Sequence, residues 1–333
     1  MKRYLLGIES TAHTFGIAVY DAKEKKFLCN LKSSYTTEKG GIIPVESAKH
    51  HEKIKDDLYK EALEKAKISE KEIKAVAFSQ GPGLSPCLLV GLRFAKKLAK
   101  KLQVPLVPVN HCIAHLEIGE LTGCKNPVLL YCSGANTQII SYAAGKYRIF
   151  GETLDIGIGN FIDTFAREIG IGFPGGPRIA ELAKSKDAKY IELPYSIKGM
   201  DVAFSGLLTN LKQKFHSKKY SKEDLAYSLQ ETAFAMLLEA SERALAHLGK
   251  KELLLGGGVA CNSRLQEMAK IMCEERGAKL FVPPSEFLLD NGGMIAYLGK
   301  KMLDAGIKFS GKDAESLDIK PRERTDDVEV KWK

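Results

Sequence analysis

The sequence lacks several features that mark membrane and secreted proteins. No apolar run approaches the roughly 20 residues that a helix needs to cross a bilayer. The first residues pass directly into a strand pattern, without the apolar core of a signal peptide. The seven cysteines are scattered and form no Cys-x-x-Cys pair, as is typical of free thiols in a reducing compartment. We therefore expect a cytoplasmic protein with no membrane partner and no cysteine-based zinc site.

The bulk composition is that of an ordinary globular protein. The chain has 333 residues, of which 44% are hydrophobic, enough for two domains with a sizeable core. Its 50 lysines and arginines outnumber its 41 acidic residues, for a net charge of +9. This excess indicates a polyanionic partner such as RNA, although lysines spread over exposed helix faces would give the same total.

A pair of histidines follows an apolar run at residues 104–109, which predicts a buried strand. Asn110 is a plausible N-cap for a helix after this strand. His111 and His115 would then lie at positions i and i+4 on one helix face, where two imidazoles can share a metal ion. The glutamate that follows the first histidine in the zinc-protease signature is absent, because Cys112 occupies that position. The pair predicts a metal site rather than that protease chemistry, and a third ligand must come from elsewhere.

Two similar strand patterns open the two parts of the chain. Residues 4–32 and 128–153 each predict three strands, with a small-residue turn between the first and second. The turns, Ser10–Thr14 and Ser133–Thr137, share three of five residues. Each pattern is followed by alternating helices and short strands, which we expect at 46–66, 75–79, 87–102 and 104–109, and again at 252–255, 262–276, 280–282 and after Asp290.

This repetition predicts an internal duplication. The predicted domains are residues 1–126, which carry the histidines, and residues 127–310, which contain a mostly helical insertion at about 156–248. A charged tail at 311–333 is expected to pack loosely.

Two related halves with facing turns predict an α/β fold of the actin-like ATPase type, as in sugar kinases and heat-shock chaperone ATPases. Turns of small residues expose backbone N–H groups that can bind phosphates. Either turn alone could be a simple hairpin, but the pair, together with the glycines at 256–258, favours phosphate binding. The phosphate turn of the first half would contain Ser10, Thr11 and His13. Glu9 is a candidate carboxylate beside it.

Longer motifs run through nearly the whole chain. They resemble those of the universal tRNA threonylcarbamoyladenosine synthase family, whose members are called TsaD in bacteria and form the catalytic subunit of the KEOPS complex in archaea and eukaryotes. The family was formerly named O-sialoglycoprotein endopeptidase. The wording of Asn110–His115 resembles the archaeal and eukaryotic branch. The matching segments are 7–14, 78–84, 110–115, 131–137, 151–155, 159–168, 173–177, 204–208, 230–234, 257–260, Asn262 and 290–292.

The resemblance implies the residues of the site. His111, His115 and Asp290 would bind one divalent metal, with Tyr131 nearby or coordinating. Iron(II) is the preferred ion and zinc(II) the alternative. A nucleotide of the ATP or AMP type, with Mg²⁺ as a companion ion, would complete the cofactors. The substrate and nucleotide would contact Tyr131, Cys132, Ser133, Gly134, Ala135, Asn136, Asp163, Gly176, Ala180, Gly257, Gly258 and Asn262.

Two of these positions depart from the family pattern. Ala135 replaces a glycine that is usual in the second turn. If that residue has a positive φ, alanine costs about 1 kcal/mol. Ala180 stands where archaeal relatives tend to carry a glutamate, so we expect one ribose contact to be missing.

The resemblance implies a metal-dependent tRNA N6-adenosine threonylcarbamoyltransferase. It would transfer the threonylcarbamoyl group from threonylcarbamoyl-AMP to the N6 amine of the adenosine 3′ of the anticodon, in tRNAs that read codons starting with A, and release AMP. Its implied partners are tRNA and the KEOPS subunits, including a small RIO-like protein kinase and small accessory proteins. Lys96, Lys97, Lys100 and Lys101 would follow the tRNA backbone.

Three alternatives remain open from the residues alone. A metal-dependent glycoprotein endopeptidase would explain the histidines but not the duplicated turns. A small-molecule kinase would explain the fold but would leave the histidines without a role. A nucleotide-gated scaffold without enzymatic activity would retain ATP and partner binding after loss of the metal ligands.

Overall fold

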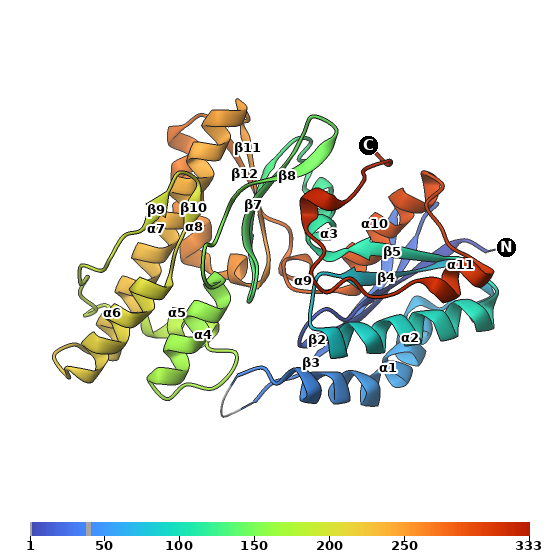
Figure 1. The fold of residues 1–333 in the computed structure, drawn as a ribbon, viewed down its shortest axis with the longest axis horizontal. Coiled ribbons are helices and arrows are strands. Elements are labelled where there is room, and N and C mark those ends of the chain that lie inside the picture. The colour runs from blue at the N-terminus through green and yellow to red at the C-terminus, as the bar shows by residue number, and fades with distance from the viewer. Residues whose placement is uncertain (1, 38–40) are drawn as a thin grey trace.

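The computed structural model describes residues 2–37 and 41–333, and it contains two five-stranded sheets side by side (Figure 1). The strand orders are β3-β2-β1-β4-β5 and β12-β11-β6-β7-β8. In each sheet three antiparallel strands are followed by two strands that run parallel to the first. The predicted duplication is thus present as a repeated sheet topology.

The first sheet is covered by helices on both faces. α1 and α2 pack together on one face, and α10 packs on the other against β1, β2 and β4. Their apolar side chains fill two of the three buried clusters. The bounds are β1 (Tyr4–Glu9), β2 (Thr14–Asp21), β3 (Lys26–Ser34), α1 (Pro44–Ala66), η1 (Glu70–Glu72), β4 (Ile73–Gly81), α2 (Ser85–Leu102), β5 (Leu106–Asn110), α3 (His111–Glu117) and η2 (Ile118–Thr122).

The second sheet packs against a group of helices that forms the third buried cluster. Most of these helices belong to the insertion, which is mostly helical as predicted. The bounds are β6 (Val128–Cys132), β7 (Thr137–Ala143), β8 (Lys146–Glu152), α4 (Ile158–Glu168), α5 (Gly176–Leu182), β9 (Ile197–Lys198), β10 (Asp201–Val202), α6 (Ser205–His216), α7 (Lys222–Leu248), β11 (Glu252–Gly256), η3 (Gly258–Cys261), α8 (Ser263–Glu275) and β12 (Lys279–Phe281).

The last part of the chain returns to the first sheet through α9 (Ser285–Leu288) and α10 (Gly292–Asp304). Glycines permit this close approach. A Cβ atom added to Gly7 would lie 2.2 Å from the Gly292 carbonyl oxygen, and one added to Gly299 would lie 2.4 Å from the Cβ of Ala77. The spatial first half therefore includes α10, although α10 lies inside the range 127–310 along the chain. This return brings Asp290 to the edge of the first sheet.

The prediction that the charged tail packs loosely is wrong. The tail contains α11 (Gly311–Ser316) and η4 (Thr325–Asp327), and its backbone joins the end of β4 and the loop after it: Lys320 N–H donates to the Gln80 carbonyl, and Gly83 N–H donates to the Pro321 carbonyl. Thr325 is buried, and the Trp332 ring stacks on Tyr147. Backbone pairing and one aromatic ring hold this segment, and neither is visible in its charge pattern.

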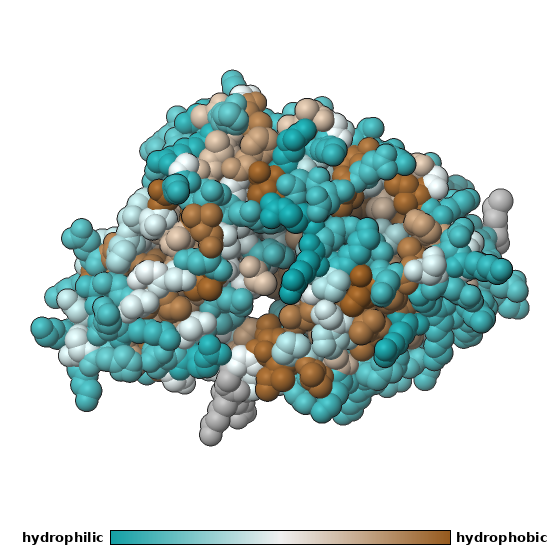
Figure 2. All heavy atoms as spheres, viewed as in Figure 1, coloured by the Kyte–Doolittle hydropathy of each residue, from teal (hydrophilic) through white to brown (hydrophobic). Residues whose placement is uncertain are grey.

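The described surface is mostly hydrophilic in Figure 2, and this face is hollowed between the two halves. No described helix has the length and apolar character that a membrane span requires. The halves also touch directly, since Phe173 N–H donates to the Thr37 carbonyl at 3.1 Å. Loops of the two halves are thus in direct contact.

Candidate metal and nucleotide site

The histidine helix begins where the sequence predicts. Asn110 ends β5 and caps α3, because its side-chain oxygen accepts the Ile113 N–H at 3.1 Å. His111 and His115 therefore occupy one face of the first turns of α3, with ring centroids 4.8 Å apart. Both are buried. Val104 is not part of the preceding strand, since its N–H donates to the Ala99 carbonyl at the end of α2.

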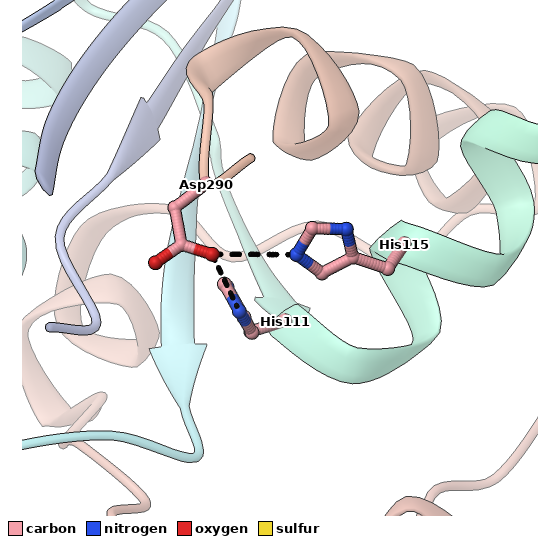
Figure 3. A group of neighbouring side chains, drawn as sticks. All are labelled: His111, His115 and Asp290. Carbon is pink, nitrogen blue, oxygen red and sulfur yellow. Dashed lines mark hydrogen bonds and ion pairs between the residues drawn. The ribbon is translucent and has the colours of Figure 1, made fainter. Parts of the chain in front are cut away.

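Asp290 completes a cluster of three candidate metal ligands (Figure 3). Its Oδ1 lies 3.4 Å from Nε2 of His111 and 3.4 Å from Nε2 of His115. The three ligand atoms lie within 4.8 Å of one another. Two imidazole nitrogens and one carboxylate oxygen fit a divalent ion such as iron(II) or zinc(II). The Tyr131 hydroxyl lies 3.0 Å from His111 Nε2, which makes it a neighbour of the same position.

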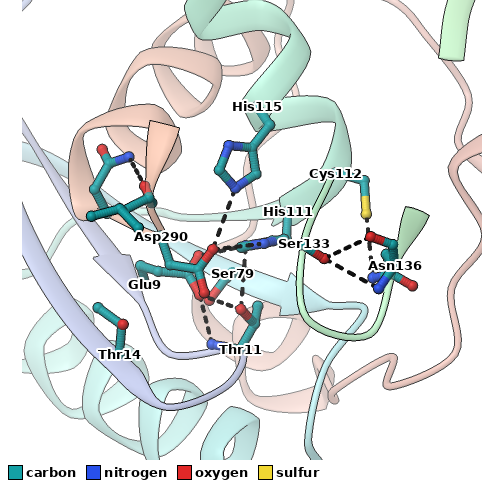
Figure 4. A network of polar contacts seen from close by, with 12 residues as sticks. Glu9, Thr11, Thr14, Ser79, His111, Cys112, His115, Ser133, Asn136 and Asp290 are labelled. Atoms are coloured by element: carbon teal, nitrogen blue, oxygen red, sulfur yellow. Dashed lines mark hydrogen bonds and ion pairs between the residues drawn. The ribbon is translucent and has the colours of Figure 1, made fainter. Parts of the chain in front are cut away.

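Glu9 orients one of the two histidines (Figure 4). Its Oε2 lies 2.9 Å from His111 Nδ1, while its Oε1 accepts the backbone N–H and the hydroxyl of Thr11, both at 2.6 Å. Glu9 is fully buried. A proton on Nδ1 directed at this carboxylate leaves the Nε2 lone pair free for a metal. Sequence reasoning placed Glu9 near the first turn but missed its role in orienting His111. The only signal for that role in the sequence was the position of Glu9 at the end of a strand.

The charged groups of the cluster shift one another's pKa values. Burial alone would raise the pKa of Asp290, but His111 and His115 hold it well below its usual value. Burial alone would lower the pKa of His111, but Tyr131, Glu9 and Asp290 raise it above its usual value. Burial lowers the pKa of His115 and raises the pKa of the Tyr131 phenol. These shifts favour an ionised Asp290, a charged His111 between Glu9 and Asp290, a neutral His115 and a protonated Tyr131, so a metal ion would take the place of the proton on His111 Nε2.

A Glu9→Gln variant is expected to bind the divalent metal about 10–100-fold more weakly, the usual effect of removing an outer partner of a ligating histidine. Glutamine keeps the size of the side chain but removes the charge that fixes the Nδ1 proton. Calorimetric titration with zinc measures the effect, with the exposed Glu52→Gln as the matched control. Equal zinc affinity of wild type and Glu9→Gln would contradict the orienting role.

The second turn lies across from the end of β1, with His111 between them (Figure 4). It is closed by hydrogen bonds from Ser133 N–H to the Asn136 carbonyl (2.9 Å) and from Asn136 N–H to Ser133 Oγ (3.1 Å). The start of α4 holds it from behind, since Asn160 N–H donates to the Gly134 carbonyl at 2.9 Å. The Cys132 side chain points into the core of the second half, so only its backbone is available at this edge.

The expected conformational cost of Ala135 is absent. Its φ is not positive: among the described residues, the non-glycine positions with positive φ are Lys25, Lys67, Gln103, Ala144 and Lys218. The alanine therefore sits in a conformation that any residue adopts, and the turn does not require glycine there.

An Ala135→Gly variant is consequently expected to be less stable by about 0.4–1 kcal/mol, because glycine adds conformational entropy to the unfolded chain. Its affinity for AMP should stay unchanged. Urea denaturation and AMP titration check the two expectations. Tighter AMP binding by the glycine variant would show that Ala135 does impair the nucleotide site.

Apart from the second turn, the predicted nucleotide residues form two groups in the second half. Asp163 in α4 accepts the Gly175 N–H at 2.8 Å and so faces the start of α5, where Gly176 lies; Ala180 follows one turn later in the same helix. A Cβ on Gly176 would meet nothing within 4 Å, so this helix start is open. Burial raises the pKa of Asp163, although the N–H groups of Gly175 and Gly176 oppose the rise.

The second group is the glycine loop after β11. Gly257 has φ +88°, and a Cβ there would lie 2.3 Å from the Cys132 carbonyl oxygen, so this position requires glycine. A Cβ on Gly258 would lie 3.4 Å from Leu289, the residue before Asp290. Asn262 caps α8, as its sequence position suggests, and its amide donates to Gln230. The loop thus adjoins the segment that carries the third metal ligand.

The three predicted residues of the first turn, Ser10, Thr11 and His13, each contact a different neighbour. Ser10 donates its N–H to Ser79 Oγ at 3.0 Å, and its own Oγ is buried without a described partner. Thr11 binds Glu9. His13 packs the edge of its ring on Phe173 of the second half, with centroids 5.3 Å apart. His13 therefore lies at the contact between the halves.

Three of the four lysines expected to follow tRNA already have partners in the chain. Lys96 Nζ donates to the Glu315 and Leu317 carbonyls, Lys97 pairs with Asp56, and Lys101 pairs with Glu70. Only Lys100 has no partner among the described residues. The sequence could not show this, because the partners come from α1, η1 and the tail. Lys97 and Lys101 remain more than half exposed in these surface pairs, so the expectation that the four lysines follow tRNA stays a prediction.

The repeated sheets, the facing turns and the histidine–aspartate cluster define an actin-like ATPase-type α/β protein with a candidate metal centre. Solved structures share this fold. HypF of T. kodakarensis matches with a TM-score of 0.63 at 15% identity, covering 90% of this chain and 48% of that chain. The Clostridium difficile activator of 2-hydroxyisocaproyl-CoA dehydratase, with bound ADPNP, matches with a TM-score of 0.55 at 11% identity, covering 92% and 99%. At such identities the likeness concerns the fold alone.

Sequence relatives give the family. The family model of TsaD, tRNA N6-adenosine threonylcarbamoyltransferase, matches residues 26–297. A protein of that name from Thermococcus sibiricus is 56% identical over 327 residues, covering 98% of this chain and 99% of its own. Another from Thermofilum pendens is 49% identical over 330 residues, covering 99% and 97%. The chain belongs to the TsaD family, and the resemblance seen in the sequence is confirmed.

Proposed function

We propose that the chain transfers a threonylcarbamoyl group from threonylcarbamoyl-AMP to the N6 amine of the adenosine 3′ of the anticodon, in tRNAs that read codons starting with A, and releases AMP. The observation that carries the proposal is the cluster of His111, His115 and Asp290, placed beside the phosphate turns of a chain that belongs to the TsaD family. We assign the cluster to iron(II), with zinc(II) as the alternative, and the cleft to the nucleotide.

The chemistry of the acceptor explains why the site takes this form. An adenine amine is a weak nucleophile because its lone pair is delocalised into the ring, so the reaction depends on stabilising the electrophile. A divalent ion held by the three ligands would supply Lewis-acid stabilisation. The protein contributes a fixed arrangement, in which Glu9 orients His111 beside the two turns.

The partners follow from the same assignment. A Methanosarcina mazei relative is named as a probable bifunctional tRNA threonylcarbamoyladenosine biosynthesis protein, and this chain covers 60% of it at 51% identity. Some relatives thus carry a second part in the same chain. We propose that this protein works in the cytoplasm with KEOPS subunits, among them a small RIO-like kinase and small accessory proteins, and that tRNA is its macromolecular substrate.

Nucleoside mass spectrometry tests the proposal. Unmodified tRNA that reads an A-starting codon is incubated with this protein, an enzyme that generates threonylcarbamoyl-AMP, and archaeal-type accessory subunits. Threonylcarbamoyladenosine should form with wild type and not with His111→Ala. The exposed His216→Ala, whose histidine pairs with Glu168 on the surface, is the matched control and should remain active.

Two results would contradict the proposal. If His111→Ala formed as much product as wild type, the metal cluster would have no part in the reaction. If wild type formed no product in a mixture where the Thermococcus sibiricus protein is active, the proposed reaction would be wrong for this protein. Peptide hydrolysis by wild type that disappears in His111→Ala would instead favour the endopeptidase.

A further inference from the structure

A lysine on the outer strand of the first sheet faces the same side as the metal cluster. Lys32 on β3 pairs with Gly16 on β2, and Gly16 pairs with Glu9 on β1. Directly opposed residues in antiparallel strands project from the same face of a sheet. Lys32, Gly16 and Glu9 therefore form one row across three strands, and Glu9 at its inner end contacts His111.

The face that carries this row meets the segment after Asp290. A Cβ added to Gly16 would lie 2.8 Å from the Gly292 nitrogen and 3.3 Å from the Asn291 Cα, so the middle of the row is in contact with that segment. Asn30, two residues before Lys32 on the same face, accepts the Gly293 N–H at 3.1 Å. Lys32 thus extends from the outer strand toward the segment that supplies the third metal ligand.

Lys32 has no polar partner of its own within residues 2–37 and 41–333. Although the residue as a whole is exposed, partial burial of its ammonium group lowers the pKa of that group, while Asp290, Cys261 and Glu286 oppose the change. Cys261 belongs to η3, directly after the glycine loop of the second half. The strand register therefore places Lys32 on the face of the first sheet that meets the metal segment, with Cys261 of the second half among its electrostatic neighbours.

A lysine in this position fits the donor of the proposed reaction. Many lysines in the described part of the chain donate to a carboxylate or a carbonyl oxygen. The three N–H donors of Lys32 have no such partner there. Threonylcarbamoyl-AMP carries two oxyanions, one phosphate and one carboxylate, and either could accept these donors. An ammonium–oxyanion hydrogen bond is stronger than a neutral one and needs only a point charge.

We propose that Lys32 binds an oxyanion of the small-molecule donor, either its phosphate or its carboxylate, beside Asp290. The inference rests on the proposed function, because it takes its ligand from that reaction. It adds a lysine to a site to which the first half otherwise contributes the turn at Ser10–Thr14. Lys32 is in this sense a binding residue and not a metal ligand.

The experiment compares variants of the full-length, metal-loaded protein by calorimetry at constant ionic strength. Lys32→Met removes the charge and keeps the length, Lys32→Arg restores the charge, and Lys26→Met is the control at the exposed start of the same strand. The probes are AMP, N-carbamoyl-L-threonine and adenosine. Lys32→Met should weaken AMP or N-carbamoyl-L-threonine about 10–100-fold, the effect of one charged hydrogen bond, and leave adenosine unchanged.

The pattern identifies the oxyanion. A loss confined to AMP assigns Lys32 to the phosphate, and a loss confined to N-carbamoyl-L-threonine assigns it to the carboxylate; Lys32→Arg should recover most of either. Unchanged binding of both probes would overturn the proposal, as would an equal loss for adenosine or for Lys26→Met. If only tRNA binding weakened, the proposal would also be wrong. Because these measurements need no transfer, they can succeed even if the proposed reaction fails.

Discussion

An Asp290→Asn variant is expected to lose its metal and more than about 100-fold of its transfer activity. One carboxylate oxygen faces both Nε2 atoms, so Asp290 alone joins the two histidines into a site. Asparagine keeps the shape but removes the charge that a divalent ion requires. Since removing an outer partner already costs 10–100-fold, removing a direct ligand should cost more. Metal content by mass spectrometry and threonylcarbamoyladenosine formation measure the effect.

The matched control lies at the C-terminal end of α10, the helix that follows Asp290. Asp304 ends α10 and makes an exposed ion pair with Lys300, so Asp304→Asn should retain both metal and activity. Both variants should remain folded, because neither substitution removes apolar packing. Full metal content in Asp290→Asn would show that the ion, if any, is held elsewhere.

A Lys301→Met variant is expected to lower the free energy of unfolding by about 3 kcal/mol. Its ammonium group contacts Glu117, the last residue of α3, which is fully buried and also accepts the Tyr147 hydroxyl. Removing one partner of a buried pair leaves a carboxylate with too little compensation and typically costs 3–5 kcal/mol. The low end applies here, since Lys333 still lies 3.2 Å from the Glu117 carboxylate.

This ion pair also connects the two segments that carry the metal ligands. Glu117 lies two residues after His115, and Lys301 lies on the helix that follows Asp290. Metal affinity should therefore fall together with stability. Urea denaturation and zinc titration measure both, and Lys300→Met, which breaks only a surface pair, should change stability by at most about 0.5 kcal/mol. Equal effects of the two lysine variants would rule out a special role for Glu117.

The sequence predicts the fold wherever the signal is local. Alternating strands, the two small-residue turns and the Asn110 cap all act within a few residues, and the structure confirms the elements that they predict. The return of α10 to the first sheet could not be predicted in this way. It depends on Gly7 and Gly292 meeting face to face, although they lie 285 positions apart.

The same distinction applies to the site. The spacing of His111 and His115 indicates a metal without other information, and the second turn and the glycines at 256–258 indicate phosphate binding. Asp290, Asp163 and Gly176 came only from the family resemblance. The orienting role of Glu9 was missed because its partner is 102 residues away. The tail was misjudged because its charges suggested solvent, while its backbone pairs with the loop after β4.

The contact between β1 and α10 affects how the protein folds during its synthesis on the ribosome. The ribosome delivers Gly7 long before Ala296, which packs against it. At 5–20 residues per second, the first strand waits about 15–60 s for the helix that covers it. Through that interval the apolar inner face of the first sheet has no cover from its own chain. A newborn chain of this kind depends on protection against aggregation for most of its synthesis, and its metal site forms only in the last stage.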